Sequence, residues 1–164
     1  MAKFLAIDPG KDGFLAGIDD GEWCFWPMPV VKSAGGGKRE YDLYACADIL
    51  RTFEPDQLIV EKQQAGSFRP GAKGGATSAF STGYGYGIWL ALAAAFYIPV
   101  LSPAPRSWQA VMCCDLPGED PKARALLAAQ RRFPGIDLRA TERCTKPHSG
   151  KVDAMLMAAW GMTQ

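Results

Sequence analysis

This chain lacks an excess of charge of either sign. Its 164 residues carry 18 Lys and Arg against 17 Asp and Glu, so the net charge is only +1. This balance produces no global basic field that would attract nucleic acid. A nucleic-acid-binding function must therefore depend on local clusters of charge.

Long hydrophobic runs are also missing. No charged residue occurs from Gly74 to Pro105, but the densely apolar part, Ile88–Leu101, has 14 residues and is interrupted by Pro99. A membrane helix needs about 20 consecutive apolar residues. We therefore expect no membrane segment, and instead a long helix over Thr77–Tyr97 that is buried on more than one side.

The cysteines are too irregularly spaced to indicate a disulfide framework. The five cysteines are an odd number without regular spacing, which favours free thiols in a reducing compartment. The N-terminus enters a strand-like run directly, with no signal or transit peptide pattern. We expect a cytoplasmic protein.

Three acidic residues, by contrast, stand beside apolar runs. Asp8 follows Phe4–Ile7, Glu61 follows Leu58–Val60, and Asp153 opens an apolar, helix-like run. A carboxylate in apolar surroundings is unfavourable unless something compensates its charge. Mg²⁺ prefers carboxylate oxygens, and a two-metal site collects acids from distant parts of a chain. The pattern favours a metal site.

Each acid also has a structural interpretation. Asp8 precedes Pro-Gly and can form a turn, and Asp153 can be a first-turn acid stabilised by the helix dipole. Glu61 is harder to explain in this way, because a buried strand delivers it to a sheet edge. No single acid is decisive.

The remaining pattern predicts an α/β fold. Phe14–Ile18 and Trp23–Trp26 flank Asp19-Asp20-Gly21, which is a hairpin signal. We expect one domain over residues 1–164, with a mixed five-stranded sheet and helices on both faces. Three strands of this sheet would be antiparallel, followed by two parallel strands.

Two helices have recognisable N-caps. Asp42 can cap a helix that ends before Pro55, and Asp120-Pro121 places Pro at a first helical position. The predicted buried face of the first helix is Leu43, Cys46, Ala47 and Leu50. The predicted apolar side of the second is Ala123, Leu126, Leu127 and Gln130.

Basic residues concentrate in two Gly-rich stretches that contain no acid. Val30–Arg39 and Lys62–Ala76 are predicted to be loops flanking the acid-bearing strands. They suit a phosphate backbone led toward bound metals, although ordinary solvated loops have the same composition.

The order of the three acids resembles the ribonuclease H-like nucleases, and most of all the RuvC-type Holliday junction resolvases. Ile7–Gly10 matches the opening of that family, Ile59–Glu61 its second acid, and Asp153-Ala154 its closing helix. The order of helices and strands between the acids is also similar. The resemblance covers nearly the whole chain.

The resemblance implies a structure-specific endonuclease for four-way DNA junctions, from a prokaryote or a phage-infected cell. Asp8, Glu61 and Asp153 would hold two Mg²⁺ ions, for which Mn²⁺ would substitute. The product would be a nick with a 5′ phosphate and a 3′ hydroxyl. The working form would be a homodimer, because two opposed strands must be cut.

A stripe of small residues suits close helix packing. Gly83, Gly87, Ala91 and Ala95 recur every four residues in the predicted long helix. We call these four residues the small-residue stripe. It faces either the sheet or a second subunit.

The chain departs from the family pattern near its last acid. Many relatives carry an acid or a His three residues before the last Asp, where this chain has Gly150. His148 is a candidate metal ligand or general base, and Lys151 is the other candidate to assist catalysis. His148 can equally be a surface or helix-capping residue.

Predicted DNA contacts lie around the acids. Relatives carry a basic residue at Lys122, and an aromatic shortly after the Glu, where this chain has Gln64. Phe68 is the candidate to stack on an unpaired base instead. The other predicted DNA contacts are Lys11, Lys62, Arg69, Lys73 and Arg106.

Three other functions share parts of this pattern. A noncatalytic junction-binding protein of this fold would be expected to lack an acid, and all three are present. An actin-like or sugar-kinase-like ATPase also opens with a strand ending in Asp-x-Gly, but needs a second domain. A nuclease for flaps or forks shares every residue named above and is the principal alternative.

Overall fold

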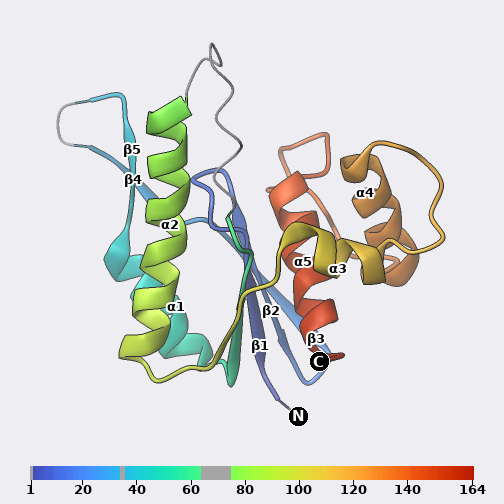
Figure 1. The fold of residues 1–164 in the computed structure, drawn as a ribbon, viewed down its shortest axis with the longest axis horizontal. Helices are drawn as coiled ribbons and strands as arrows, with labels where there is room; N and C mark the ends of the chain where they lie inside the picture. Colours follow the sequence, from blue (N-terminus) through green and yellow to red (C-terminus); the bar gives the residue numbers. More distant parts are fainter. Residues whose placement is uncertain (1, 34–35, 64–74) are drawn as a thin grey trace.

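A mixed five-stranded sheet forms the centre of the molecule (Figure 1). The computed structural model describes residues 2–33, 36–63 and 75–164. The strand order is β3-β2-β1-β6-β7, with β1–β3 antiparallel and β1, β6 and β7 parallel, which confirms the predicted sheet. The strands are β1 Phe4–Ile7, β2 Phe14–Asp19, β3 Glu22–Pro27, β6 Gln57–Val60 and β7 Val100–Leu101.

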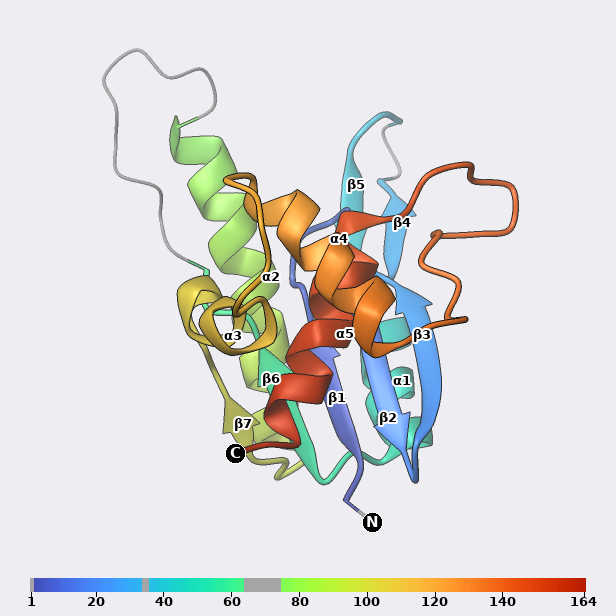
Figure 2. The same cartoon turned by 90° about the vertical axis from the view of Figure 1, so that its right-hand side faces the viewer.

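Helices cover both faces of this sheet, as predicted. Figures 1 and 2 show α1 and α2 on one face and α3, α4 and α5 on the other. Their bounds are α1 Leu43–Phe53, α2 Gly75–Ala95, α3 Pro105–Met112, α4 Pro121–Arg132 and α5 Ser149–Gly161.

Alternation along the strands divides the core into two clusters. In β1, Leu5 and Ile7 pack toward α1 and α2, whereas Ala6 packs toward α5. In β6, Ile59 faces the same side as Ala6. Since successive strand residues point to opposite faces, the residue that follows each strand belongs to the α5 side.

A second, two-stranded sheet corrects the loop prediction for Val30–Arg39. β4 Val30–Lys32 pairs antiparallel with β5 Arg39–Tyr41. The β-branched valines of β4 favour an extended backbone. Tyr41 is buried at the end of this hairpin, and its hydroxyl donates to the Pro9 carbonyl at 2.8 Å. The hairpin is thereby fixed to the segment after β1.

The N-cap of α1 is confirmed, but its buried face differs from the prediction. The Asp42 carboxylate accepts a hydrogen bond from Ala45 N–H at 3.0 Å. Leu43 is 46% exposed, while Phe53 is buried at the far end of the helix. Phe53 lies over Gly17, where a Cβ would approach its ring to within 2.7 Å. Only a glycine in β2 admits this ring, a contact that helical periodicity alone does not reveal.

The apolar side of α4 was predicted incorrectly, although its cap is confirmed. Asp120 accepts hydrogen bonds from the N–H groups of Lys122 and Ala123. The buried residues are Ala125, Ala128 and Ala129, whereas Ala123 and Gln130 are exposed. Alanines allow a close approach to α5, so the helix buries its smallest side chains.

Helix α2 contacts the sheet through a different face from the small-residue stripe. Ile88, Trp89 and Ala93 are buried against the core, and a Cβ on Gly85 would overlap Pro9 and Tyr41. The stripe itself is exposed. Among the described residues, no helix is long and apolar enough to cross a membrane.

Candidate active site

Two of the predicted acids lie side by side at the ends of parallel strands. Ile7 of β1 is paired with Val60 of β6, so Asp8 and Glu61 are the next pair in register. The Asp8 N–H donates to the Phe14 carbonyl at 3.0 Å, and the Glu61 N–H donates to the Ile7 carbonyl at 3.1 Å. The strand geometry thus continues through both acids and directs them to the α5 side.

Helix α5 brings the third acid to this sheet edge. Gly150 in its first turn faces Asp8, and a Cβ there would lie 2.8 Å from Asp8 Oδ2 and 3.2 Å from Gly13 Cα. Asp153 follows one turn later. A larger side chain at position 150 would require Asp8 or the backbone at Gly13 to shift. Glycine is therefore the residue that allows α5 to approach Asp8.

Burial dominates the electrostatics of all three acids. Desolvation raises the pKa of Asp8, raises the pKa of Glu61 to about 6, and raises the pKa of Asp153 to about 7. Repulsion from Asp8 and Glu61 further raises the Asp153 pKa, and Lys122 opposes it only partly. The acids are close enough to repel one another, and among the described residues Lys122 and His148 offset their charge only in part.

The donor set fits a hard divalent cation, since clustered carboxylates are what such a cation prefers. As placed, the described residues contain no group of three His, Cys, Asp or Glu side chains that could hold one metal ion. The acids therefore supply the charge and the oxygen donors, while the complete coordination geometry is not formed.

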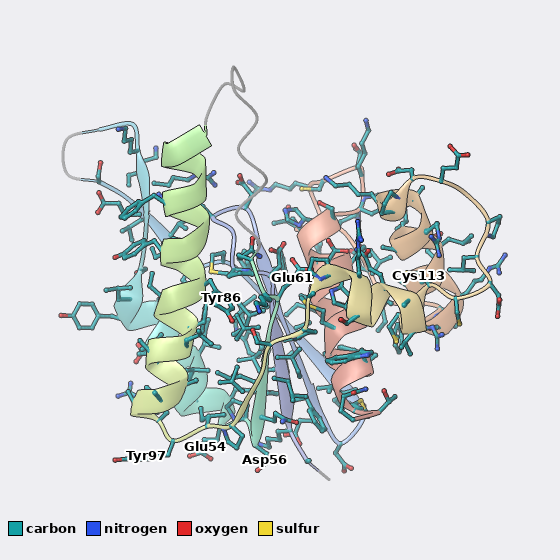
Figure 3. The ribbon with its side chains drawn as sticks, in the orientation of Figure 1. Glu54, Asp56, Glu61, Tyr86, Tyr97 and Cys113 are labelled. Atoms are coloured by element: carbon teal, nitrogen blue, oxygen red, sulfur yellow. The ribbon has the colours of Figure 1, made fainter. Side chains whose placement is uncertain are left out.

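Trp108 is a site residue that the sequence analysis missed. Its indole Nε1–H donates to Glu61 Oε1 at 3.0 Å, and its side chain is fully buried on the inner side of α3. Figure 3 shows Glu61 at the end of β6 that lies beside α3. This hydrogen bond holds one Glu61 oxygen in place. A tryptophan in a short amphipathic helix gives no sequence signal for such a role.

His148 caps α5, which was the alternative to a catalytic role. Its Nδ1 accepts from the Lys151 N–H at 3.3 Å, and its ring lies 5.1 Å from that of Phe14. While Nδ1 accepts, a neutral imidazole carries its proton on Nε2. His148 also lies close enough to Asp8 to lower the Asp8 pKa by a coulombic interaction. The ligand and general-base roles stay predictions, and both require this cap to open.

Lys151 does not point toward the acids. It is only 8% exposed, and its ammonium donates to the Arg139 carbonyl at 3.1 Å. The same ammonium lies 4.3 Å from the Phe25 ring centroid, a cation–π distance. This placement does not support its predicted catalytic role. It makes Lys151 an anchor for the segment that precedes α5.

The predicted DNA contacts are only partly described. Lys62 and Arg106 are exposed after β6 and in α3, and Lys122 is exposed in the first turn of α4. Lys11 donates to the Arg39 carbonyl and lies over the Tyr41 ring. The remaining three predicted contacts lie outside the described residues. These are Phe68, Arg69 and Lys73.

For the nuclease activity that the resemblance implies, we predict that His148→Ala lowers cleavage at least about 100-fold, the scale of a general acid–base contribution. His148→Asn is the matched control, because Asn is also a good N-cap and keeps α5 capped. We expect His148→Asn to retain the thermal midpoint without restoring cleavage. Full cleavage activity in His148→Asn would show that His148 serves only as the N-cap of α5.

Comparison with known proteins gives matches in structure alone. No family model matches the chain, and no curated protein is significantly similar to it in sequence. Thermus thermophilus RuvC matches with a TM-score of 0.55 and 15% identity, over 98% of this chain and 95% of RuvC. T. thermophilus RuvC in complex with Holliday junction substrate matches with a TM-score of 0.53 and 14% identity, over 99% and 96%.

A eukaryotic protein matches over a similar extent. The yeast mitochondrial Holliday junction resolvase Ydc2 has a TM-score of 0.54 and 17% identity, over 98% of this chain and 78% of Ydc2. At these identities the likeness concerns the path of the backbone. The chain therefore has the ribonuclease H-like fold of the RuvC-type resolvases.

Proposed function

We propose that this protein is a divalent-metal-dependent endonuclease that resolves four-way DNA junctions by paired nicks. The observation that carries the proposal is the set of three desolvated acids at one edge of a resolvase-like sheet. A bound cation would compensate the charge that the described basic residues offset only in part, and cations held by clustered carboxylates serve phosphodiester hydrolysis in two-metal sites. The RuvC complex with a Holliday junction supports the choice of substrate.

Asp8, Glu61 and Asp153 would hold two Mg²⁺ ions. When bound, these ions supply an activated water and stabilise charge on the departing 3′ oxygen. The Trp108 hydrogen bond orients Glu61 before any ligand arrives. Lys122 lowers the pKa of Asp8 and of Asp153, and this proximity to the acids supports a role in neutralising a phosphate. His148, the N-cap residue of α5, offers a further hydrogen-bond donor beside the acids.

We further propose that α2 forms the homodimer interface. Its exposed surface carries the uncharged small-residue stripe together with Phe80, which is 74% exposed, and Tyr84, which is 48% exposed. The rings of Phe80 and Tyr84 stack with centroids 6.1 Å apart. A helix surface without charge is poorly suited to water, and a second copy would cover it.

We predict that Gly87→Leu converts a wild-type dimer into a folded monomer. A Cβ at Gly87 meets no described atom within 4 Å inside the protomer, so we expect the larger side chain to leave the fold intact and to clash with an external partner. Ala110→Leu adds the same side chain at an exposed position on α3 and should leave the dimer intact. Sedimentation measures both. A dimeric Gly87→Leu protein would show that α2 is not the interface.

We predict that Lys122→Ala weakens junction binding and reduces the log–log salt slope by about one unit, as expected for one lost phosphate contact. Arg51→Ala is the control, because Arg51 is exposed in the last turn of α1 and pairs with Asp48. Fluorescence anisotropy over a salt series gives both slopes. An unchanged salt slope for Lys122→Ala would show that this lysine does not contact the DNA phosphates.

The substrate is tested by a cleavage assay on synthetic four-way junctions, flaps and linear duplexes with Mg²⁺. The proposal expects symmetric nicks in junctions and little cutting of duplex. Preferential cutting of flaps would favour the branched-DNA nuclease instead. Junction binding without cutting would indicate a noncatalytic protein.

A further inference from the structure

Strand β3 forms one edge of the central sheet, and Figure 2 shows it opposite the edge formed by β7. The β2–β3 turn has positive φ at Asp20 and Gly21, and a two-residue turn of this kind is closed by a hydrogen-bonded pair. Such pairs alternate along an antiparallel ladder with pairs that share no hydrogen bond. The Met28 N–H, which donates to the Gly13 carbonyl at 3.1 Å, continues the same alternation beyond β3.

This alternation leaves the backbone groups of Trp23 and Phe25 without a partner in β2. Trp23 lies opposite Ile18 and Phe25 lies opposite Ala16, and these are the two non-hydrogen-bonded pairs in the middle of the ladder. Their N–H and C=O groups point away from β2. In the described part of the chain, no backbone hydrogen bond reaches these groups from another segment. Because backbone polar groups are strong hydrogen-bonding groups, an added strand would supply partners for all four.

The middle of β3 lacks the features that usually protect an edge strand. Edge strands are commonly blocked by charged side chains, by proline or by a bulge. Residues 23–26 of β3 carry no charge, and their register with β2 contains no bulge. Glu22 and Pro27 stand only at the two ends of the strand. The strand is therefore open to pairing at its centre.

The strand is complementary to a second copy of itself. An antiparallel pair with its two-fold axis at Cys24 places Trp23 opposite Phe25 of the second copy, and all four free backbone groups of each strand then find partners. A register centred on Phe25 would instead use Pro27, whose nitrogen has no hydrogen to donate. In the register centred on Cys24, the two Glu22 residues lie about 13 Å apart along the strands, beyond the range of strong repulsion at physiological salt.

Side chains on both faces of the sheet suit this pairing. Trp23 and Phe25 lie on the α5 side, and their stacked ring centroids are 5.8 Å apart. Pairing would place aromatic rings opposite one another across the strands, which stabilises a sheet. On the other side, a largely apolar groove of about 370 Å³ lies between β3 and α1, where Cys24, Trp26 and Ile49 line it. A second strand would shield the rim of this groove from water.

We infer that β3 pairs with β3 of a second copy about Cys24, so that two five-stranded sheets join into one. The contact is distinct from the proposed α2 interface, because α2 packs against β6 and β3 lies at the opposite edge of the sheet. Both contacts can therefore exist together, and they would join two α2 dimers. The β3 contact is small, so we expect a Kd on the order of 100 µM, weaker than that of the α2 dimer. The inference does not depend on nuclease activity.

A disulfide between two Cys24 thiols tests the register in the wild-type protein. Residues directly opposite in a non-hydrogen-bonded pair have Cα atoms about 4.5 Å apart, within the range that a disulfide spans. The protein is treated with diamide, which accepts the two hydrogens of the thiols, at a concentration above the expected Kd. We expect a covalent dimer whose linked peptides join Cys24 to Cys24. Cys24→Ser should lose this product, whereas Cys114→Ser, which removes an exposed cysteine outside β3, should keep it.

Sedimentation of the Gly87→Leu protein separates this contact from the α2 interface. We expect this protein to be a monomer at micromolar concentration and to dimerise through β3 at higher concentration. Cys24→Lys in this background places two like charges opposite each other and should weaken the dimer about tenfold, whereas Cys24→Ser should preserve it. The Cys24 side chain borders the groove, so a lysine can extend through it to solvent without disturbing the fold.

Two results would overturn the inference. One is a wild-type protein that diamide links only through Cys114 or Cys144, or not at all. The other is equal self-association of the Cys24→Lys and Cys24→Ser proteins, provided that circular dichroism shows both to be folded. If α2 is not the dimer interface, the disulfide experiment still decides whether β3 pairs, because it reads the contact in the wild-type chain.

Discussion

Replacing Asp8 or Asp153 by Asn should abolish junction cleavage, with a loss of at least about 1,000-fold in rate, because each change removes a metal-holding oxygen and its charge. Junction binding should stay unchanged or become tighter, since phosphate repulsion falls. The measurement is single-turnover cleavage together with anisotropy of the same labelled junction.

Asp12→Asn is the matched control for these two variants. Asp12 lies four residues from Asp8, but its side chain is exposed and pairs with Arg39. We expect it to leave the cleavage rate within a few fold of wild type. Near-native cleavage by Asp8→Asn or Asp153→Asn would remove the three acids from the reaction.

The second large effect concerns stability and pH. Burial raises the pKa of Asp153 to about 7 and the pKa of Glu61 to about 6. Between about pH 4 and pH 7, the folded protein therefore holds protons on these carboxyl groups that the unfolded chain has released. This contribution to stability is fully present below about pH 4 and is lost as the pH rises to about 7. Asp153→Asn should therefore raise the thermal midpoint at about pH 8 by several degrees.

The advantage of Asp153→Asn should shrink at about pH 5, where wild-type Asp153 is largely protonated in the folded state. Mg²⁺ should stabilise the wild-type protein at about pH 8 and have less effect on the variant, because bound metal stabilises only a folded site that retains its ligands. Differential scanning fluorimetry measures both proteins at about pH 8, at about pH 5, and at about pH 8 with Mg²⁺. A variant less stable than wild type at about pH 8 would show that burial of the charged Asp153 carboxylate does not destabilise the fold.

Apolar runs, turn and cap signals, and the resemblance to the RuvC-type resolvases predicted most of the fold. Asp19-Asp20-Gly21 located the β2–β3 hairpin, and Asp42 and Asp120 located two helix starts. The buried faces of the helices were harder to predict, because each is determined by the strand or helix against which it packs. Phe53 packs over Gly17 of β2, and α4 buries its alanines against α5. Neither contact appears in the periodicity of one segment.

The candidate site, like the fold, could be predicted from the sequence only in part. Asp8 and Glu61 stand at strand ends, a position that the sequence reveals, and parallel pairing then brings them together. Gly150 and Trp108 act through contacts with distant residues, so their roles became visible only in three dimensions. Lys151 has the charge of a catalytic group, but Arg139 and Phe25 hold its ammonium elsewhere.

Incubation with a supercoiled plasmid that extrudes a cruciform tests the central claim most directly. Two coordinated nicks convert such a plasmid into linear DNA, whereas one nick leaves an open circle. We expect linear product with Mg²⁺, none with EDTA, and none with Asp153→Asn. Linear product in EDTA, or equal cutting of a plasmid without the cruciform, would contradict a metal-dependent junction resolvase.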